Sequence, residues 1–99
     1  MSTFDKHIAA DRRLTILQLL AASSGYRMNA STLRDALPGF GHSVSEDAIH
    51  NDLAWLAEQG LVTNKEFGEL TIATLSARGL DVQADRAWVP GIKRPRPSE

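Results

Sequence analysis

The sequence contains no cysteine, and its 99 residues include only two tryptophans, one tyrosine and three phenylalanines. Without cysteine there is neither a disulfide framework nor a metal site built from thiolates. No apolar run approaches the ~20 residues that a helix needs to span a bilayer. The N-terminus also lacks the basic and then apolar order of a secretion signal. We therefore expect a cytoplasmic protein that does not associate with membranes.

An excess of positive charge is also absent, since 11 Lys and Arg residues stand against 12 Asp and Glu residues. Proteins that mainly bind nucleic acid usually carry a basic balance or a strongly basic patch. The basic residues gather at Arg12–Arg13, at Arg27 with Arg34, and at Lys93, Arg94 and Arg96. Local basic patches are therefore compatible with the sequence, although the overall charge gives little support for nucleic-acid binding.

The length and apolar content predict one domain with a single modest core. From Asp5 to Ala22 the apolar residues recur with the period of a helix, and Ser23-Ser24-Gly25 ends it. A short helix from Ala30 to Leu37 should follow, with Asn29 as its N-cap and Pro38-Gly39 as its stop. The connection to the next helix is brief, so the two helices should cross steeply, as in a helix-turn-helix.

A third helix should end at Gly60, a residue that suits a helix C-terminus. Two residues are candidates for its N-cap: Ser43, in a capping box with Glu46, or Ser45. The apolar residues Ile49, Leu53 and Leu56 share one face at three- and four-residue steps. The opposite face carries Asp47, His50, Asn51, Ala54 and Glu58. The sequence does not separate the two caps, but it predicts which face is buried.

Two strands should come next, Leu61 to Glu66 and Leu70 to Thr74, because they are rich in Val, Thr and Ile and are joined by Phe67-Gly68-Glu69. Ser76 should cap a fourth helix that runs to about Arg86. Gly79 inside this helix should cost ~1 kcal/mol relative to alanine. The order helix, helix, helix, strand, strand, helix predicts a mainly α protein with a small β-hairpin, a winged helix-turn-helix.

From Val89 onward the sequence VPGIKRPRPSE is too rich in proline and glycine for a helix or a strand. We expect a winged-helix domain at residues 1–88 and an extended or disordered basic arm at residues 89–99. Such an arm could place Lys93, Arg94 and Arg96 on a DNA groove or backbone. It could equally serve only to keep the protein soluble, and the sequence favours neither function.

The third helix resembles the recognition helix of DeoR-like and related winged-helix bacterial regulators. The matching scaffold positions are Ser45, Ala48, Ile49, Asp52, Leu53, Leu56 and Gly60. The resemblance implies a helix that enters the major groove of DNA. Where that family has a basic pair, this chain has His50 and Asn51. Asn51 can pair bidentately with adenine, but the charge that anchors phosphates is missing.

Over nearly its whole length the chain resembles the small winged-helix proteins of Mu-like phages and prophages, often labelled arsenic-repressor-like. The most specific part is the block DLAWLAEQGLV from Asp52 to Val62. The other matching segments are Asp11 to Leu14, Ile16-Leu17, Leu20, Thr74-Leu75, Arg78-Gly79, Val89 to Gly91 and Lys93 to Pro95. The resemblance implies the winged-helix fold and a phage or prophage protein that acts in a bacterial host cell.

These features together favour a DNA-binding transcriptional regulator. Its third helix should enter the major groove of double-stranded DNA through Ser43, Asp47, His50 and Asn51. The wing residue Lys65 and the arm residues Lys93, Arg94 and Arg96 should contact the backbone. A homodimer through the first and last helices would match a palindromic site. Leu80 would lie in that interface or, as we slightly prefer, in the monomer core.

The alternative is a winged-helix protein–protein interaction module in a phage assembly or transposition complex that does not bind DNA. The acidic face of the third helix favours it, because Glu46, Asp47 and Glu58 have no Lys or Arg beside them on that helix. An enzyme is not expected, since neighbouring carboxylates on a helix diverge and no nucleophile or phosphate-loop motif is present. No metal or cofactor is expected either, because His7, His42 and His50 are widely separated in the sequence.

Overall fold

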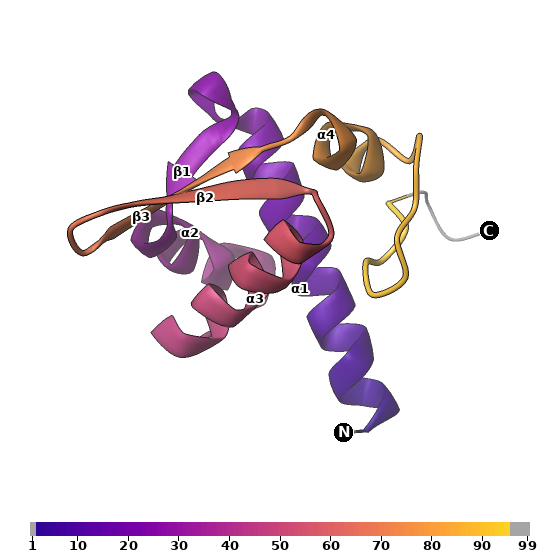
Figure 1. Cartoon of the computed structure of the whole chain (residues 1–99). Helices are drawn as coiled ribbons and strands as arrows, with labels where there is room; N and C mark the ends of the chain where they lie inside the picture. The colour runs from indigo at the N-terminus through magenta and orange to yellow at the C-terminus, as the bar shows by residue number, and fades with distance from the viewer. Residues whose placement is uncertain (1, 96–99) are drawn as a thin grey trace.

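Four helices and a small antiparallel sheet surround one apolar core in the computed structural model, which describes residues 2–95 (Figure 1). The helices are α1 (Thr3–Ala22), α2 (Ala30–Ala36), α3 (Glu46–Glu58) and α4 (Ala77–Gln83). The strands are β1 (Arg27–Asn29), β2 (Val62–Phe67) and β3 (Leu70–Leu75), and two 3-10 turns are η1 (Ser24–Tyr26) and η2 (Leu37–Phe40). The predicted winged helix-turn-helix is confirmed.

The first helix is longer than its apolar pattern predicts. It begins at Thr3 because the Ser2 hydroxyl accepts a hydrogen bond from the Asp5 amide at 3.1 Å, which caps the first turn. Its C-terminal half is the centre of the core and contributes Leu14, Ile16, Leu17 and Leu20. Residues 2–8 are exposed, and this end of α1 projects from the body (Figure 1). No helix within residues 2–95 is both long and apolar enough to cross a membrane.

The third helix begins after Ser45, whose hydroxyl accepts a hydrogen bond from the Ala48 amide at 3.1 Å. Ser45 is therefore the N-cap, and of the two candidates Ser43 is excluded. The predicted inner face is confirmed, since Ile49, Leu53 and Leu56 are at most 1% exposed. This face packs against α2 and the start of β2, so it fixes how α3 is presented to solvent.

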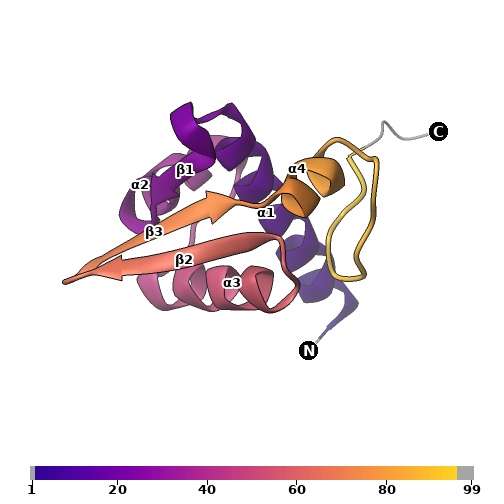
Figure 2. The same ribbon diagram turned by 45° about the horizontal axis from the view of Figure 1, so that its top comes forward.

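The sheet has a strand that the sequence analysis missed. Its order is β1-β3-β2, and β1 pairs antiparallel with β3 so that Arg27 lies opposite Thr74. With only three residues, β1 is too short for a recognisable alternation, and its partner is more than 40 positions away in the sequence. The hairpin of β2 and β3 is the wing, and it extends away from the helices (Figure 2).

Gly79 in α4 is required by close packing. A Cβ at this position would lie 2.2 Å from the carbonyl oxygen of Leu61 and 2.6 Å from Cδ1 of Leu75. The glycine lets α4 approach the backbone between α3 and β2, and this contact offsets its poor helix propensity. The helix ends at Gln83, earlier than the predicted Arg86.

Residues 88–94 form a segment that we call the C-terminal strap, which lies beside α1 and α4 (Figures 1 and 2). Val89 and Ile92 are 7% and 3% exposed and belong to the core. The Lys93 amide donates to the Ala10 carbonyl at 3.2 Å, and the Trp88 indole N–H donates to the Ile92 carbonyl at 3.0 Å. The prediction of an arm separate from residues 1–88 is therefore wrong up to residue 95.

The physical reason is that Val89 and Ile92 bury apolar surface, which outweighs the unsuitability of proline and glycine for regular structure. The strap uses turns instead of a helix or strand, and Gly91 adopts a φ of +100° in one of them. Arg96, predicted to belong to the arm, lies outside the described residues.

The packing of α4 leads to a first prediction. Gly79→Ala should lower the free energy of unfolding by about 1–3 kcal/mol, because the added methyl group overlaps a backbone oxygen that cannot move alone. Gly39→Ala is the matched control, since a Cβ at Gly39 meets no atom within 4 Å. Chemical denaturation of both variants measures the difference. Equal midpoints would mean that α4 does not pack this closely.

Candidate nucleic-acid interface

The face of α3 opposite the core is open to solvent. Asp47, Asn51, Ala54 and Glu58 are exposed on it, and Ser43 is exposed in the segment just before the helix. The N-terminal end of α3 and the tip of the wing lie toward the same end of the molecule (Figures 1 and 2). The structure thus brings together three of the predicted contact residues, Ser43, Asp47 and Asn51, on a surface that a groove of DNA could reach.

His50 is less exposed than these residues and lies beside Glu46. Its side chain is 42% exposed, and its Nε2 is 3.9 Å from Oε2 of Glu46 one turn earlier. Glu46 also forms an ion pair with Arg34 of α2, at 3.6 Å. The negative charge of Glu46 is therefore partly compensated. Among residues 2–95, no cation lies within ion-pair distance of Asp47 or Glu58, so the outward face of α3 remains acidic.

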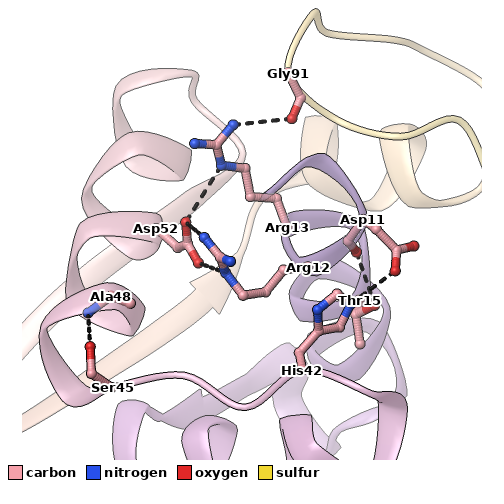
Figure 3. A network of polar contacts seen from close by, with 9 residues as sticks. All are labelled: Asp11, Arg12, Arg13, Thr15, His42, Ser45, Ala48, Asp52 and Gly91. Carbon is pink, nitrogen blue, oxygen red and sulfur yellow. Dashed lines mark hydrogen bonds and ion pairs between the residues drawn. The ribbon is translucent and has the colours of Figure 1, made fainter. Parts of the chain in front are cut away.

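One acidic residue of α3 turns inward and is held by two arginines of α1 (Figure 3). The Asp52 side chain is only 4% exposed. Arg12 donates to both of its oxygens, with Nη2 at 3.1 Å from Oδ1 and with Nε bonded to Oδ2. Nε of Arg13 lies 3.5 Å from Oδ1, an ion pair too long for a good hydrogen bond. We call these three residues the Asp52 clamp.

The clamp also reaches the C-terminal strap. The Arg13 guanidinium lies 4.3 Å from the centroid of the Trp55 ring, and its Nη1 donates to the Gly91 carbonyl at 3.2 Å. Gly91 packs on Trp55 so closely that a Cβ would be 2.7 Å from the ring. The hydrogen bond to Asp52 raises the pKa of Arg12, against the lowering effect of its burial, and the charge of Asp52 adds to the increase.

The basic cluster Arg12–Arg13, noted in the sequence as a candidate local basic patch, has a structural role in this arrangement. Arg12 and Arg13 lie at an internal junction, where their charges compensate a buried carboxylate and a tryptophan face. They therefore hold α1, α3 and the strap together. Neither guanidinium is presented on the outward face of α3.

A second polar link joins α1 to the turn before α3. The buried ring of His42 places Nε2 2.9 Å from Oδ2 of Asp11, and Nζ of Lys93 lies 3.5 Å from the other oxygen of that carboxylate. Arg94 pairs with Asp85 at 3.4 Å. The two basic residues of the strap are thus engaged with carboxylates of their own chain.

The predicted backbone contacts are not brought together with α3. Lys65 lies on β2 of the wing, and the wing extends toward the same end of the molecule as the start of α3. Lys93 and Arg94 lie on the strap at the opposite end (Figures 1 and 2). A duplex that met both α3 and the wing would not reach these two residues without a rearrangement, and Arg96 lies outside the described residues.

Two curated proteins are similar in sequence. Protein gp26 of Escherichia phage Mu is 44% identical over 90 residues, which cover 91% of this chain and 93% of the phage protein. This chain belongs to the gp26 family. A protein of Haemophilus influenzae is 35% identical over 79 residues, covering 79% of this chain and 76% of its own. The predicted link to Mu-like phages is confirmed, and no family model matches the chain.

Solved structures similar to this gp26-family chain are winged-helix proteins. Sco5413, a MarR family transcriptional regulator from Streptomyces coelicolor, superposes with a TM-score of 0.63 at 25% identity, over 73% of this chain and 47% of that chain. A "possible transcriptional regulator for arsenical resistance" gives a TM-score of 0.58 at 28% identity, over 75% of this chain and 70% of that chain. The chain spans about half the length of Sco5413.

A third structure, hsRosR-S1, gives a TM-score of 0.68 at 20% identity, over 82% of this chain and 71% of that chain. At this identity the likeness concerns the fold alone. Together the three superpositions support the winged helix-turn-helix assignment. The finer resemblances to DeoR-like and arsenic-repressor-like proteins stay predictions.

The Asp52 clamp was missed by the sequence analysis, although its residues were noted separately. An aspartate among polar neighbours on a helix ordinarily faces water, and adjacent arginines ordinarily form a surface patch. One signal was present. Asp52 follows Ile49 by three residues and precedes Leu56 by four, so it lies at the border of the apolar face, where a charge needs a partner.

The clamp gives a second prediction. Asp52→Ala should lower the free energy of unfolding by about 3–5 kcal/mol, because it leaves two partly buried guanidiniums without their carboxylate. Asp47→Ala on the outward face of the same helix is the control, and it should change stability by less than about 0.5 kcal/mol. Thermal and urea unfolding compare the two. Similar small losses for both variants would show that the clamp does not hold α1 to α3.

Proposed function

We propose that this protein is a DNA-binding regulator of a phage or prophage, and that it places the outward face of α3 in the major groove of double-stranded DNA. The observation that carries the proposal is the open polar face of α3 beside a projecting wing, in a fold shared with transcriptional regulators. The proposal is for a binding protein and not for an enzyme. A homodimer through α1 and α4 remains part of it.

The groups on α3 suit base edges better than phosphates. The Asn51 amide can donate to and accept from adenine, and the Asp47 carboxylate can accept from the amino group of cytosine. Ser43 and His50 each offer one further hydrogen bond at the N-terminal end of the helix. In this proposal, affinity for a preferred sequence comes largely from these contacts.

Charge limits the part of binding that does not depend on sequence. Each phosphate that a cation neutralises adds about −0.9 to the slope of log K against log salt. Lys65 is the predicted backbone contact on the wing, which extends toward the end of the molecule where α3 begins, whereas Lys93 and Arg94 are paired with Asp11 and Asp85 on the strap. We therefore expect weak non-specific binding and a shallow salt dependence, with a slope of about −1 to −2.

A second candidate function is the protein–protein interaction module. The specific observation in its favour is that Asp47 and Glu58 keep their charge uncompensated on the most accessible face of α3. Such a face would oppose phosphates and attract a basic partner. Under this alternative, Asp47→Lys abolishes binding to the partner and DNA binding is absent even at low salt.

A third prediction tests the DNA proposal. Fluorescence anisotropy should show tighter binding to a labelled fragment from the region around the gene of this protein than to a random duplex. Asn51→Ala should weaken binding to that fragment by about tenfold or more, because a bidentate base contact contributes about 1–3 kcal/mol. The same variant should bind the random duplex as the unaltered protein does.

Arg94→Ala is the matched control, since this arginine is exposed and lies on the strap, at the end of the molecule opposite the start of α3. It should leave the affinity for both duplexes and the salt slope unchanged. A loss of binding with Arg94→Ala but not with Asn51→Ala would move the interface to the strap. Absence of binding to any duplex at low salt would remove the DNA proposal and favour the protein partner.

A further inference from the structure

One face of the wing is uncovered and differs in chemistry from the rest of the surface. In the hairpin register, three pairs lie directly opposite each other: Thr63 and Thr74, Lys65 and Ile72, and Phe67 and Leu70. On the other edge of β3, Arg27 of β1 lies opposite Thr74. Residues directly opposite each other, and those two positions along a strand, lie on the same side of a sheet. We call this side the outer wing face: Arg27, Asn29, Thr63, Lys65, Phe67, Leu70, Ile72 and Thr74.

The alternate residues of β2 and β3 show which side of the sheet faces the core. Val62, Ala73 and Leu75 are buried in the core, and the side-chain amide of Asn64 donates to the Leu53 carbonyl of α3 at 3.0 Å. The outer wing face is therefore the side turned away from the helices. In both views the distal part of the hairpin extends beyond them (Figures 1 and 2).

The outer wing face is polar near the body and apolar near the tip. An antiparallel sheet with one solvated face normally carries polar residues there, as Thr63 and Thr74 do. At the tip, however, Phe67 is 59% exposed and Leu70 is 52% exposed, and Ile72 beside them is only partly buried. The pattern changes where the sheet leaves the body, which is where a partner would have the freest access.

Stabilisation of the hairpin does not fully account for these residues. A cross-strand apolar pair contributes roughly 0.2–1 kcal/mol, so contact between Phe67 and Leu70 favours this register. Even in contact, each keeps about half of its surface in water. Exposed aromatic and aliphatic side chains grouped at one tip are the kind of anchor that protein interfaces bury.

The charges on the outer wing face indicate which partner would fit. The face carries the cations Arg27 and Lys65, and within residues 2–95 neither forms an ion pair. This contrasts with Arg12, Arg34 and Arg94, which all face carboxylates. Glu66 alternates to the other side of the sheet, and Glu69 lies in the turn. This face therefore carries two cations without an ion pair: Lys65 lies in the row next to the apolar tip, and Arg27 lies in the row nearest the body.

We infer that the outer wing face docks an acidic protein segment that carries apolar side chains. Acidic groups would pair with Arg27 and Lys65, and an apolar side chain would cover Phe67 and Leu70. Phosphates of DNA could satisfy the two cations but would leave the apolar tip exposed. The inference concerns a different face from the outward face of α3. The two proposed interfaces share Lys65, which is also the proposed contact to the DNA backbone, but the inference does not depend on base contacts by α3.

The experiment uses three short fluorescein-labelled peptides as probes, of alternating glutamate and leucine, glutamate and serine, and lysine and leucine. The glutamate–leucine peptide should bind the intact protein, and the other two should bind at least about tenfold more weakly. Phe67→Ser with Leu70→Ser, and separately Arg27→Glu, should each weaken that binding by about tenfold or more. Amide NMR shifts on adding the peptide should concentrate in β2 and β3.

The matched control is Phe4→Ser with Lys6→Glu, which removes an exposed aromatic residue and reverses a cation on α1, away from the wing. This variant should bind the peptide as the unaltered protein does. Because every substituted side chain is exposed, circular dichroism should show all variants folded. The DNA fragments of the previous experiment are measured with the same proteins.

Three results would overturn the inference. One is equal peptide binding by the intact protein and both wing variants. Another is equal binding of the glutamate–serine peptide, which would leave only charge attraction. The third is loss of DNA binding, and not of peptide binding, in the Phe67 and Leu70 variant, because the tip would then be a DNA contact. Failure of the Asn51 test alone would leave the inference intact.

Discussion

The buried carboxylate of Asp52 is the interaction on which the arrangement of this protein depends. A charge that is 4% exposed is stable only with partners, and its partners are two consecutive arginines of α1. Because Arg13 also contacts the Trp55 ring and the Gly91 carbonyl, a single charge cluster connects α3, α1 and the strap. The orientation of α3, and hence of its exposed residues, follows from this junction as much as from apolar packing.

The clamp also explains the unusual electrostatics of the surface. Basic side chains are present in ordinary number, but Arg12 and Arg13 point inward, Arg34 faces Glu46, and the strap cations face Asp11 and Asp85. What remains on the outward face of α3 is acidic and amidic, and what remains on the outer wing face is cationic and apolar. The two faces are thus suited to different kinds of molecule, which is why we propose separate partners for them.

The periodicity of apolar residues, with local turn and cap signals, predicted most of the fold. The spacing of Ile49, Leu53 and Leu56, the glycine in the hairpin and the caps at Asn29 and Ser76 are local signals, and each corresponds to the structure. β1 could not be predicted in this way because three residues make no period. Its existence depends on β3, which is brought beside it only by the fold.

The candidate site was less predictable, for a related reason. Exposure of Asp47 and Asn51 follows from helix geometry, so the outward face of α3 could be predicted. Ser43 lies before the helix, so its exposure does not follow from helix geometry. The pairing of Asp52 with residues 40 positions earlier could not, because a sequence shows charges without showing which of them are buried together. The strap was wrongly predicted to be an extended or disordered arm, because a composition rich in proline and glycine excludes regular structure but does not exclude burial.

The strap has a consequence for how the chain is made. Its contacts with the helices are with segments that leave the ribosome earlier: Ala10, Asp11 and Arg13 of α1, and Trp55 of α3. Until residues 89–92 emerge, the places that Val89 and Ile92 fill are open to water, and the nascent helices expose apolar surface that attracts chaperones or neighbouring chains. Completion of the native core is therefore coupled to the end of translation of this segment, and premature termination before Val89 would yield a product destined for proteolysis.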